Sequence, residues 1–276
     1  MTTLLPRVVA GAPPATREIE LVVSDRVEDV DDALAVVHEG FVESGFMLAQ
    51  RSGRRFHPAY LNPGTMFAVA RIDGEPIGAA AMIVDGPFGL PCERAFAEEV
   101  DALRAVSASP IVECGSFAVL APWRRHTRRV FVRIMAAFAR IALEEFPDAP
   151  GLMTVSPETE RFYGSFGGFT RIADERPLFG APALLMLSPN AVEASRHHRL
   201  GTTQGQRTID RLTHEPDPRW LVDRRDHLPL PVDWLQALAD EQFAASPLVA
   251  QLRLLRARYP EVLRSLTAPV ARARTG

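Results

Sequence analysis

The stretch "ECGSFAVLAPWRRHTRRVFVRIM", residues 113–135, decides the fold because it holds a strand, a loop and the start of a helix. Residues 110–121 are mostly apolar and predict a long strand, and apolar residues then recur at helical spacing over residues 131–142. The loop between them therefore lies at a helix N-terminus, where backbone N–H groups can bind a phosphate. Such junctions are often rich in glycine, but this loop carries Arg124, Arg125, Arg128 and Arg129.

The segments on either side alternate between predicted strands and helices. Two apolar runs are joined by "DGEP", which predicts a hairpin with Gly74 free to take a positive φ. Alternation with a hairpin inside it predicts an α/β fold: a mixed, mostly antiparallel sheet with helices on both faces. The predicted order is strand 19–23, helix 27–41, two strands within 65–86, helix 92–106, strand 110–121, helix 129–144, strand 151–155, a helix starting near 156, and closing strands within 170–175 and 181–188.

The sequence becomes more polar and loses its regular apolar pattern near residue 190. Residues 1–18 predict a flexible lead-in, residues 19–190 one α/β domain, and residues 191–276 a polar linker followed by a helical extension. The linker is predicted from "RHHRLGTTQGQRT", residues 196–208, and the extension from helix-like segments at 231–243 and 246–266.

Composition excludes several classes of function. With 47% hydrophobic and 24% charged residues and a formal charge of −3, the 276-residue chain predicts a globular protein with no bulk affinity for nucleic acid. Cys92 and Cys114 form no C-x-x-C or Cys/His cluster, so neither a metal site nor a disulfide framework is expected. No segment approaches the roughly 18 apolar residues of a membrane span. These features predict a cytoplasmic protein.

Three motifs carry a family resemblance: "GLPCERAFAEEVDALR" at 89–104, "ECGSFAV" at 113–119 and "FYGSFGGF" at 162–169. With the element order, they resemble the GNAT acyltransferase superfamily over about residues 19–188. More narrowly, they resemble the N-acyl amino acid synthases of the FeeM type and the related LuxI-type acyl-homoserine lactone synthases. The resemblance implies an enzyme that moves a long-chain fatty acyl group from a thioester on acyl carrier protein to the amine of an amino acid or similar small molecule. It implies no cofactor besides acyl carrier protein or acyl-CoA as co-substrate.

Glu113 is the first candidate catalytic residue. A carboxylate in an apolar strand is costly to bury without a partner or a task, and alternation also allows it to face solvent. The resemblance implies that Glu113 accepts a proton from the attacking amine, which has no lone pair while it is an ammonium.

Tyr163 is the second candidate, and the resemblance implies that its phenol protonates the departing thiolate. Packing beside Phe162, Phe166 and Phe169 is the alternative interpretation. The match is imperfect, because "GSFGGF" has one residue more before its final "GF" than the usual spacing and Ser156 stands where asparagine is common.

The arginine loop is predicted to bind the donor. In the resembling coenzyme A enzymes the loop reads R-x-x-G-x-G/A, but Thr127 and Arg129 stand at the glycine positions. A positive loop with crowded backbone suits a single phosphate carried by an acidic protein better than free coenzyme A. A solvated helix start is the alternative, although clustered cations at a positive helix end are disfavoured. The predicted donor-binding residues are Phe117, Ala118, Val119 and Leu120, whose backbone N–H groups would hold the oxyanion, with Arg124, Arg125, Arg128 and Arg129.

The acyl chain and the acceptor need sites of their own. Phe67 and Met82 are predicted to line the acyl pocket, and plain core packing is the alternative for each. LuxI-type synthases carry E-x-S-R-F, whereas Ser116 occupies the arginine position here, so S-adenosylmethionine and a lactone product are not expected. An acceptor carboxylate would need a cation, and the sequence leaves open which residue supplies it: Arg55, Arg71, Arg94, Arg104 or Arg171.

Two other functions fit the same motifs. The missing glycines, Ser116 and the unusual spacing after Tyr163 also suit an acyl-thioester-binding sensor or scaffold that has lost the chemistry. An ordinary acyl-CoA-dependent N-acyltransferase is the other alternative.

Overall fold

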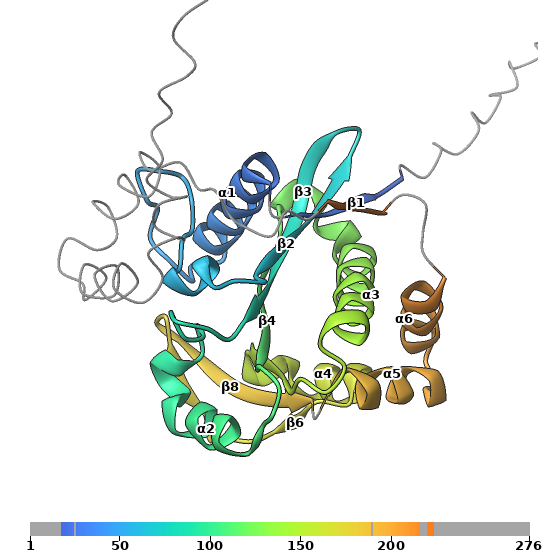
Figure 1. Cartoon of the computed structure of the whole chain (residues 1–276). Coiled ribbons are helices and arrows are strands. Elements are labelled where there is room, and N and C mark those ends of the chain that lie inside the picture. Colours follow the sequence, from blue (N-terminus) through green and yellow to red (C-terminus); the bar gives the residue numbers. More distant parts are fainter. Residues whose placement is uncertain (1–17, 25, 189, 216–219, 224–276) are drawn as a thin grey trace, which may run out of the picture.

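The computed structural model describes residues 18–24, 26–188, 190–215 and 220–223 (Figure 1). The predicted lead-in and the helix-like segments at 231–243 and 246–266 lie outside these residues, apart from residue 18. Among the described helices, none is both long enough and apolar enough to cross a membrane.

A mixed sheet forms the centre of the fold, with strand order β6-β8-β5-β4-β3-β2-β1-β9 and with β7 also pairing β8. Most neighbours are antiparallel; β4 with β5 and β1 with β9 are the parallel pairs among the described strands. The predicted mixed, mostly antiparallel sheet is confirmed. The strands are β1 Glu20–Ser24, β2 Met66–Ile72, β3 Glu75–Val84, β4 Val112–Val119, β5 Gly151–Val155, β6 Thr170–Arg171, β7 Arg176–Leu178, β8 Ala181–Ser188 and β9 Trp220–Asp223.

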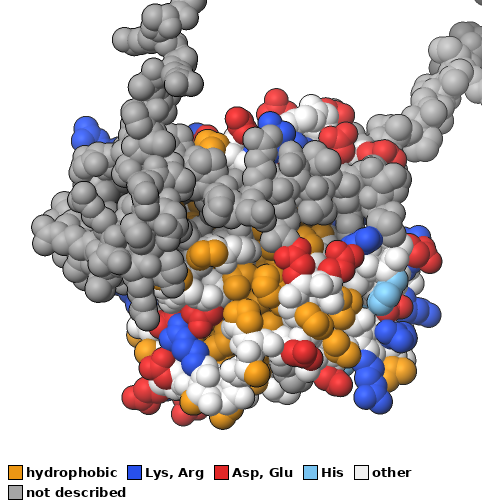
Figure 2. Space-filling view, in the orientation of Figure 1, with side chains coloured by type: hydrophobic (Ala, Val, Ile, Leu, Met, Phe, Trp, Pro, Cys, Tyr) orange, Lys and Arg blue, Asp and Glu red, His pale blue; other side chains and the backbone are white. Residues whose placement is uncertain are grey.

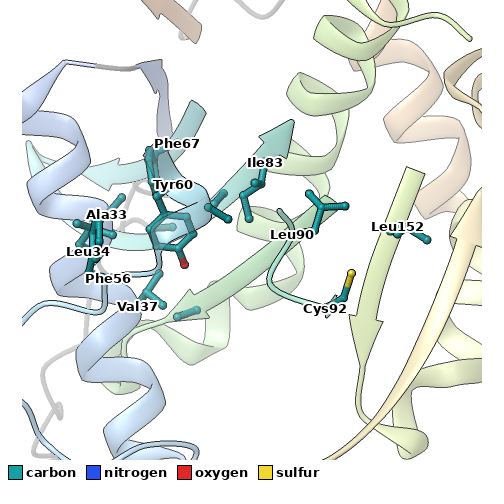
Figure 3. Packing of buried hydrophobic residues seen from close by; sticks show 14 of the residues in the cluster. Ala33, Leu34, Val37, Phe56, Tyr60, Phe67, Ile83, Leu90, Cys92 and Leu152 are labelled. Atoms are coloured by element: carbon teal, nitrogen blue, oxygen red, sulfur yellow. The ribbon is translucent and has the colours of Figure 1, made fainter. Parts of the chain in front are cut away.

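Helices cover both faces of the sheet, as Figure 1 shows. On one face, α1 (Val27–Glu43) and α2 (Glu93–Val106) pack over a core that includes Leu34, Tyr60 and Phe67. On the other face, α3 (Thr127–Glu145) packs over a second core through Ile134 and Phe138. In Figure 3, Tyr60, from the short 3-10 helix Pro58–Leu61, lies between Phe67 and the helix α1. Apolar side chains alternate along the central strands, so each strand contributes to both cores.

Strands β4 and β5 pair over only two positions, Val112 with Gly151 and Glu113 with Leu152. Beyond Glu113 the two strands have no register in common, so the sheet opens between them. Just past this point β4 also bulges against β3, where the register shifts between Ala79 and Ala81 and Ser116 takes a φ of +55°. A bulge re-aims side chains and releases backbone groups from the ladder, and it falls here at the opening of the sheet.

The end of the described chain differs from the prediction. Residues 191–214 form two helices, α5 (Ala191–Leu200) and α6 (Gln204–His214), where the sequence predicted a polar, flexible linker. Asn190 caps α5, and Thr203 with Gln206 forms a capping box at the start of α6. A narrow buried face allows so polar a segment to fold, since Ile209 and Leu212 pack with Phe131 of α3. The closing strands also differ, because 170–175 holds only the two-residue β6 and the short β7 follows it.

Candidate active site

A cavity of about 1170 Å³ lies where β4 and β5 separate. Its walls come from both faces of the sheet: Phe41 and the segment around residues 46–58 on the α1 side, and Phe131, Ile134 and Phe138 of α3 on the other. Figure 2 shows hydrophobic side chains gathered in the middle of one face of the molecule, over the region between β4 and α3. The cavity therefore passes through the sheet and is reached by residues of both cores. The strand residues on its wall include Glu113, Cys114, Gly115, Ser116, Phe117, Met153, Thr154 and Val155.

Glu113 lies on the cavity wall and is only 1% exposed, which excludes the solvent-facing alternative. Its carboxylate accepts a hydrogen bond of 3.0 Å from the backbone N–H of Cys92, in the turn before α2. Burial raises the pKa of Glu113 from 4.5 to about 7, against the lowering effect of the Cys92 hydrogen bond. A carboxyl group of this pKa exchanges protons near neutral pH, as a general base must.

Tyr163 reaches the cavity from α4 (Glu160–Gly167) and packs edge-on against Phe131. Its hydroxyl has no hydrogen-bond partner among the described residues. Burial raises the pKa of Tyr163 to about 12, so the phenol stays protonated and can donate. The ring packs with aromatic residues, as the alternative interpretation expected, and the residue also lines the cavity. The role of Tyr163 as proton donor stays a prediction.

Cys114 also lines the cavity, on the wall that faces α3. Burial, with a contribution from the nearby Glu113 carboxylate, raises the pKa of this thiol to about 12. Since the thiolate is the nucleophilic form of cysteine, Cys114 is not activated for attack.

The predicted oxyanion segment is only partly on the cavity wall. Phe117 lines the cavity, whereas Ala118 and Val119 alternate into the two cores, and the Leu120 N–H donates to the Ile77 carbonyl. The bulge centres on Ser116, one residue before the predicted segment. The structure therefore places the irregular backbone beside Glu113.

The arginine loop forms a 3-10 turn, Ala121–His126, that leads directly into α3. Arg124 pairs with Glu43 at 3.3 Å, and the Arg125 guanidinium lies over the Trp123 ring at 5.6 Å. Arg128 is exposed and Arg129 is half-buried beside His126. None of the four is among the residues that line the cavity in the described structure; they form a charged surface at the N-terminus of α3.

Phe67 and Met82, predicted for the acyl pocket, lie in the two cores and not among the lining residues. Met82 pairs across the ladder with Met66, the neighbour of Phe67, so the two side chains point to opposite faces of the sheet. On the α3 side, the apolar wall is made by Phe131, Ile134 and Met135 instead.

Of the five candidate cations for an acceptor, three are engaged in ion pairs. Arg71 pairs with Asp29 and Asp32, Arg104 with Asp85, Glu93 and Asp101, and Arg171 with Asp174. Arg55 and Arg94 instead line the cavity. Within the described residues, no group of three or more His, Cys, Asp or Glu side chains is placed to hold a metal ion.

The candidate site thus combines an opened mixed sheet, a cavity through that sheet and a buried glutamate of raised pKa. The family model for N-acyl amino acid synthase FeeM matches residues 32–189, and the chain belongs to that family. No curated protein sequence matches the chain.

Solved structures share the fold. The structure of FeeM, an N-acyl amino acid synthase from uncultured soil microbes, matches with a TM-score of 0.55 and 20% identity, covering 66% of this chain and 96% of that one. The acyl-homoserine lactone synthase LasI gives a TM-score of 0.51 and 14% identity, over 62% of this chain and 89% of its own. BjaI, a CoA-dependent acyl-homoserine lactone synthase, gives 0.51 and 15%, over 80% of this chain and 99% of its own.

Proposed function

We propose that this N-acyltransferase moves a long-chain fatty acyl group from a thioester on acyl carrier protein to the amine of an amino acid or a similar small molecule. The observation that carries the proposal is Glu113, buried on the wall of a cavity that crosses the sheet, with a pKa near neutrality. The family model supports acyl transfer to an amine.

The reaction begins with removal of a proton from the acceptor ammonium. The Glu113 carboxylate takes this proton, directly or through water, and the freed nitrogen lone pair attacks the thioester carbonyl carbon. The carbonyl oxygen becomes an oxyanion, and we assign its stabilisation to backbone N–H groups at Ser116 and Phe117. The bulge at Ser116 and the place of both residues on the cavity wall support this assignment.

Collapse of this intermediate forms the amide and breaks the carbon–sulfur bond. Tyr163 donates its phenolic proton to the departing sulfur, and the second amine proton passes to water as the amide forms. Glu113 then releases the first proton to solvent. The thiol stays with the donor, and the phenolate regains a proton from solvent.

The α3 side of the cavity suits an acyl chain. Phe131, Ile134, Met135 and Phe138 present a continuous apolar wall, and such surface binds a hydrocarbon chain by removing it from water. The adaptable methionine side chain tolerates chains of different shape.

The arginine surface supports a protein-borne donor. Arg124, Arg125 and Arg128 are exposed at the N-terminus of α3, and Arg124 pairs there with Glu43. Positive charges are unfavourable at this positive end of the helix, and further anions would stabilise them. Acyl carrier protein supplies acidic side chains and one phosphodiester, which arginines bind without requiring glycines in the loop. The free cysteines suit a reducing compartment, and we place the reaction in the cytoplasm.

The test is incubation of the protein with acyl carrier protein carrying a C12–C16 chain and with a mixture of amino acids, followed by mass spectrometry. An acyl-amine product from the carrier-bound donor, formed faster than from acyl-CoA, is the expected result. Equal use of acyl-CoA would indicate the ordinary coenzyme A acyltransferase. Acyl-dependent binding of the donor with no product from any donor would indicate the sensor alternative and contradict the proposed activity.

A further inference from the structure

Arg55 is a buried cation that forms no ion pair with a carboxylate of the described residues. Its side chain comes from the segment between α1 and the first 3-10 helix, is 9% exposed and lines the cavity. The Nη1 group donates to the Tyr60 hydroxyl and to Ser116 Oγ, each at 2.8 Å. The N–H groups on Nε and Nη2 have no partner among the described residues, and no acidic side chain there forms an ion pair with Arg55.

Aromatic rings limit where a ligand can meet this guanidinium. It lies over the ring of Phe41 at 4.8 Å and over that of Phe179 at 5.1 Å. All five N–H donors of a guanidinium lie in its plane, and neutral hydroxyl groups occupy the Nη1 position. The free Nε and Nη2 donors match the two oxygens of a carboxylate in the bidentate geometry that arginine favours.

The neighbouring charges compensate Arg55 only in part. Of the lining carboxylates, Glu113 attracts Arg55 without forming an ion pair with it, and Glu93 is held by Arg104. Arg94 adds a second positive charge beside Phe179. Burial and the two arginines lower the pKa of His57 to about 3, so this histidine is neutral. A desolvated cation that lacks a partner is costly, and a ligand anion removes that cost.

We propose that Arg55 binds the carboxylate of the acceptor and thereby restricts the enzyme to amines that carry a carboxylate close by. The inference rests on the proposed function and deepens it. Glu113 and Arg55 line one cavity and carry opposite charges, which match the ammonium and carboxylate of a free amino acid. Tyr60 and Ser116 position the guanidinium, and the bulge at Ser116 ties this anion site to the backbone that faces the reacting carbonyl.

The experiment compares substrates that differ only in the carboxylate. The best amino acid acceptor is measured against the amine in which hydrogen replaces its carboxyl group, using the full chain and the same acyl donor. The wild type is expected to favour the amino acid in kcat/KM by about 100-fold, as for a desolvated charge pair. In Arg55→Met the preference falls to near unity through a raised acceptor KM, while the donor KM is unchanged. Arg55→Lys keeps the positive charge but loses the bidentate pair of N–H donors, so it should retain part of the preference.

Arg54→Met is the matched control, because the adjacent Arg54 forms its ion pair with Asp31 on α1. It should keep the full preference. Circular dichroism checks that each variant is folded, and the substrate comparison on the wild type needs no variant. A wild type that ignores the carboxylate, or an Arg55→Met enzyme that keeps the preference, would overturn the inference while the acyltransferase function stood.

A binding measurement separates this inference from the reaction. Each of the twenty amino acids is titrated calorimetrically against the wild type, Arg54→Met and Arg55→Met without donor. Binding to the first two that is lost in Arg55→Met supports the carboxylate site even if no acyl product forms. Two results would reject the carboxylate site when no acyl product forms either. One is that no amino acid binds the wild type, and the other is that amino acids bind all three proteins equally.

Discussion

At the scale of single residues, Glu113 makes one prediction about rate. Glu113→Gln keeps the size of the side chain and an oxygen to accept the Cys92 N–H, but it removes the base. We expect kcat/KM to fall by roughly 10²- to 10⁴-fold, the usual contribution of a general base. In the wild type kcat/KM should rise through an inflection near pH 7, because the unprotonated carboxylate is active, and the variant should lack this inflection. Glu39→Gln, on the exposed side of α1, serves as the control. An unchanged pH profile in Glu113→Gln would assign the proton transfer elsewhere.

The same substitution should stabilise the protein at alkaline pH. The pKa of Glu113 is higher in the folded state than its ordinary 4.5, so folding favours the protonated form. The stability that protonated Glu113 contributes is therefore fully present below pH 4.5 and is lost as the pH rises through about 7. Removing the charge should gain about 3 kcal/mol at pH 8 and little at pH 4. Urea unfolding at both pH values measures this; a loss of stability at pH 8 would mean that the ionised carboxylate is well solvated.

Tyr163→Phe tests the proton donor. The ring packing against Phe131 is kept and only the hydroxyl is lost, so we expect kcat to fall about 100-fold, toward the lower end for general acid catalysis, with little change in KM. A donor with a more acidic thiol needs less help in leaving. The loss should therefore shrink when an aryl thioester replaces the alkyl thioester, and an equal loss with both donors would leave Tyr163 a packing residue.

The unusual place of Glu113 could be predicted from its own strand, whereas contacts assembled across the fold could not. Glu113 stands out in the sequence because a carboxylate interrupts an apolar strand. Arg55 was one of five open candidates, because its role depends on contacts with Ser116 and Phe179, which are far away in the chain. Phe67 and Met82 failed to meet in one pocket because the hairpin register, unknown from composition, sends them to opposite faces.

At the scale of elements, the arginine turn and the start of α3 act as one charged unit. The double substitution Arg125→Glu and Arg128→Glu should lower kcat/KM for a carrier-bound donor by roughly 10- to 100-fold, mainly at low salt, since exposed charges steer association. A small thioester mimic has no acidic protein to attract, so its kcat/KM should change little. Arg140→Glu, in the same helix but paired with Glu144, is the control. An equal loss of kcat/KM with both donors would indicate that the arginine turn is a solvated surface without a role in binding the carrier protein.

The elements around β4 followed from the sequence, and those after residue 190 did not. Apolar runs and helical spacing sufficed for β3, β4, α3 and β5, because each buries a broad face. The helix α6 buries only a narrow apolar stripe. Most of its residues are polar, so the sequence did not indicate a helix there. One signal was available, since Thr203 and Gln206 have the spacing of a capping box.

At the scale of the whole molecule, α5 and α6 extend the core beyond α3 and support the cavity wall from behind. Ile209 is fully buried against the group that includes Phe131, whose ring lines the cavity. Ile209→Ala should cost about 2–5 kcal/mol of unfolding free energy, because it leaves a void that the helices cannot close. Arg207→Ala on the exposed side of α6 should change little. Chemical denaturation compares the two, and equal midpoints would mean that α6 is only loosely attached.

The opening of the sheet also determines how the two substrates meet. Because the cavity has walls on both faces of the sheet, donor and acceptor can occupy it together. The raised pKa keeps the Cys114 thiol protonated, so we expect no acyl-enzyme intermediate on this residue. The kinetic mechanism should therefore pass through a ternary complex, with double-reciprocal plots that intersect. Parallel lines, or an acyl group trapped on the protein in the absence of acceptor, would reveal a two-stage exchange instead. The separation of β4 from β5 thus allows direct acyl transfer within one ternary complex of enzyme, donor and acceptor.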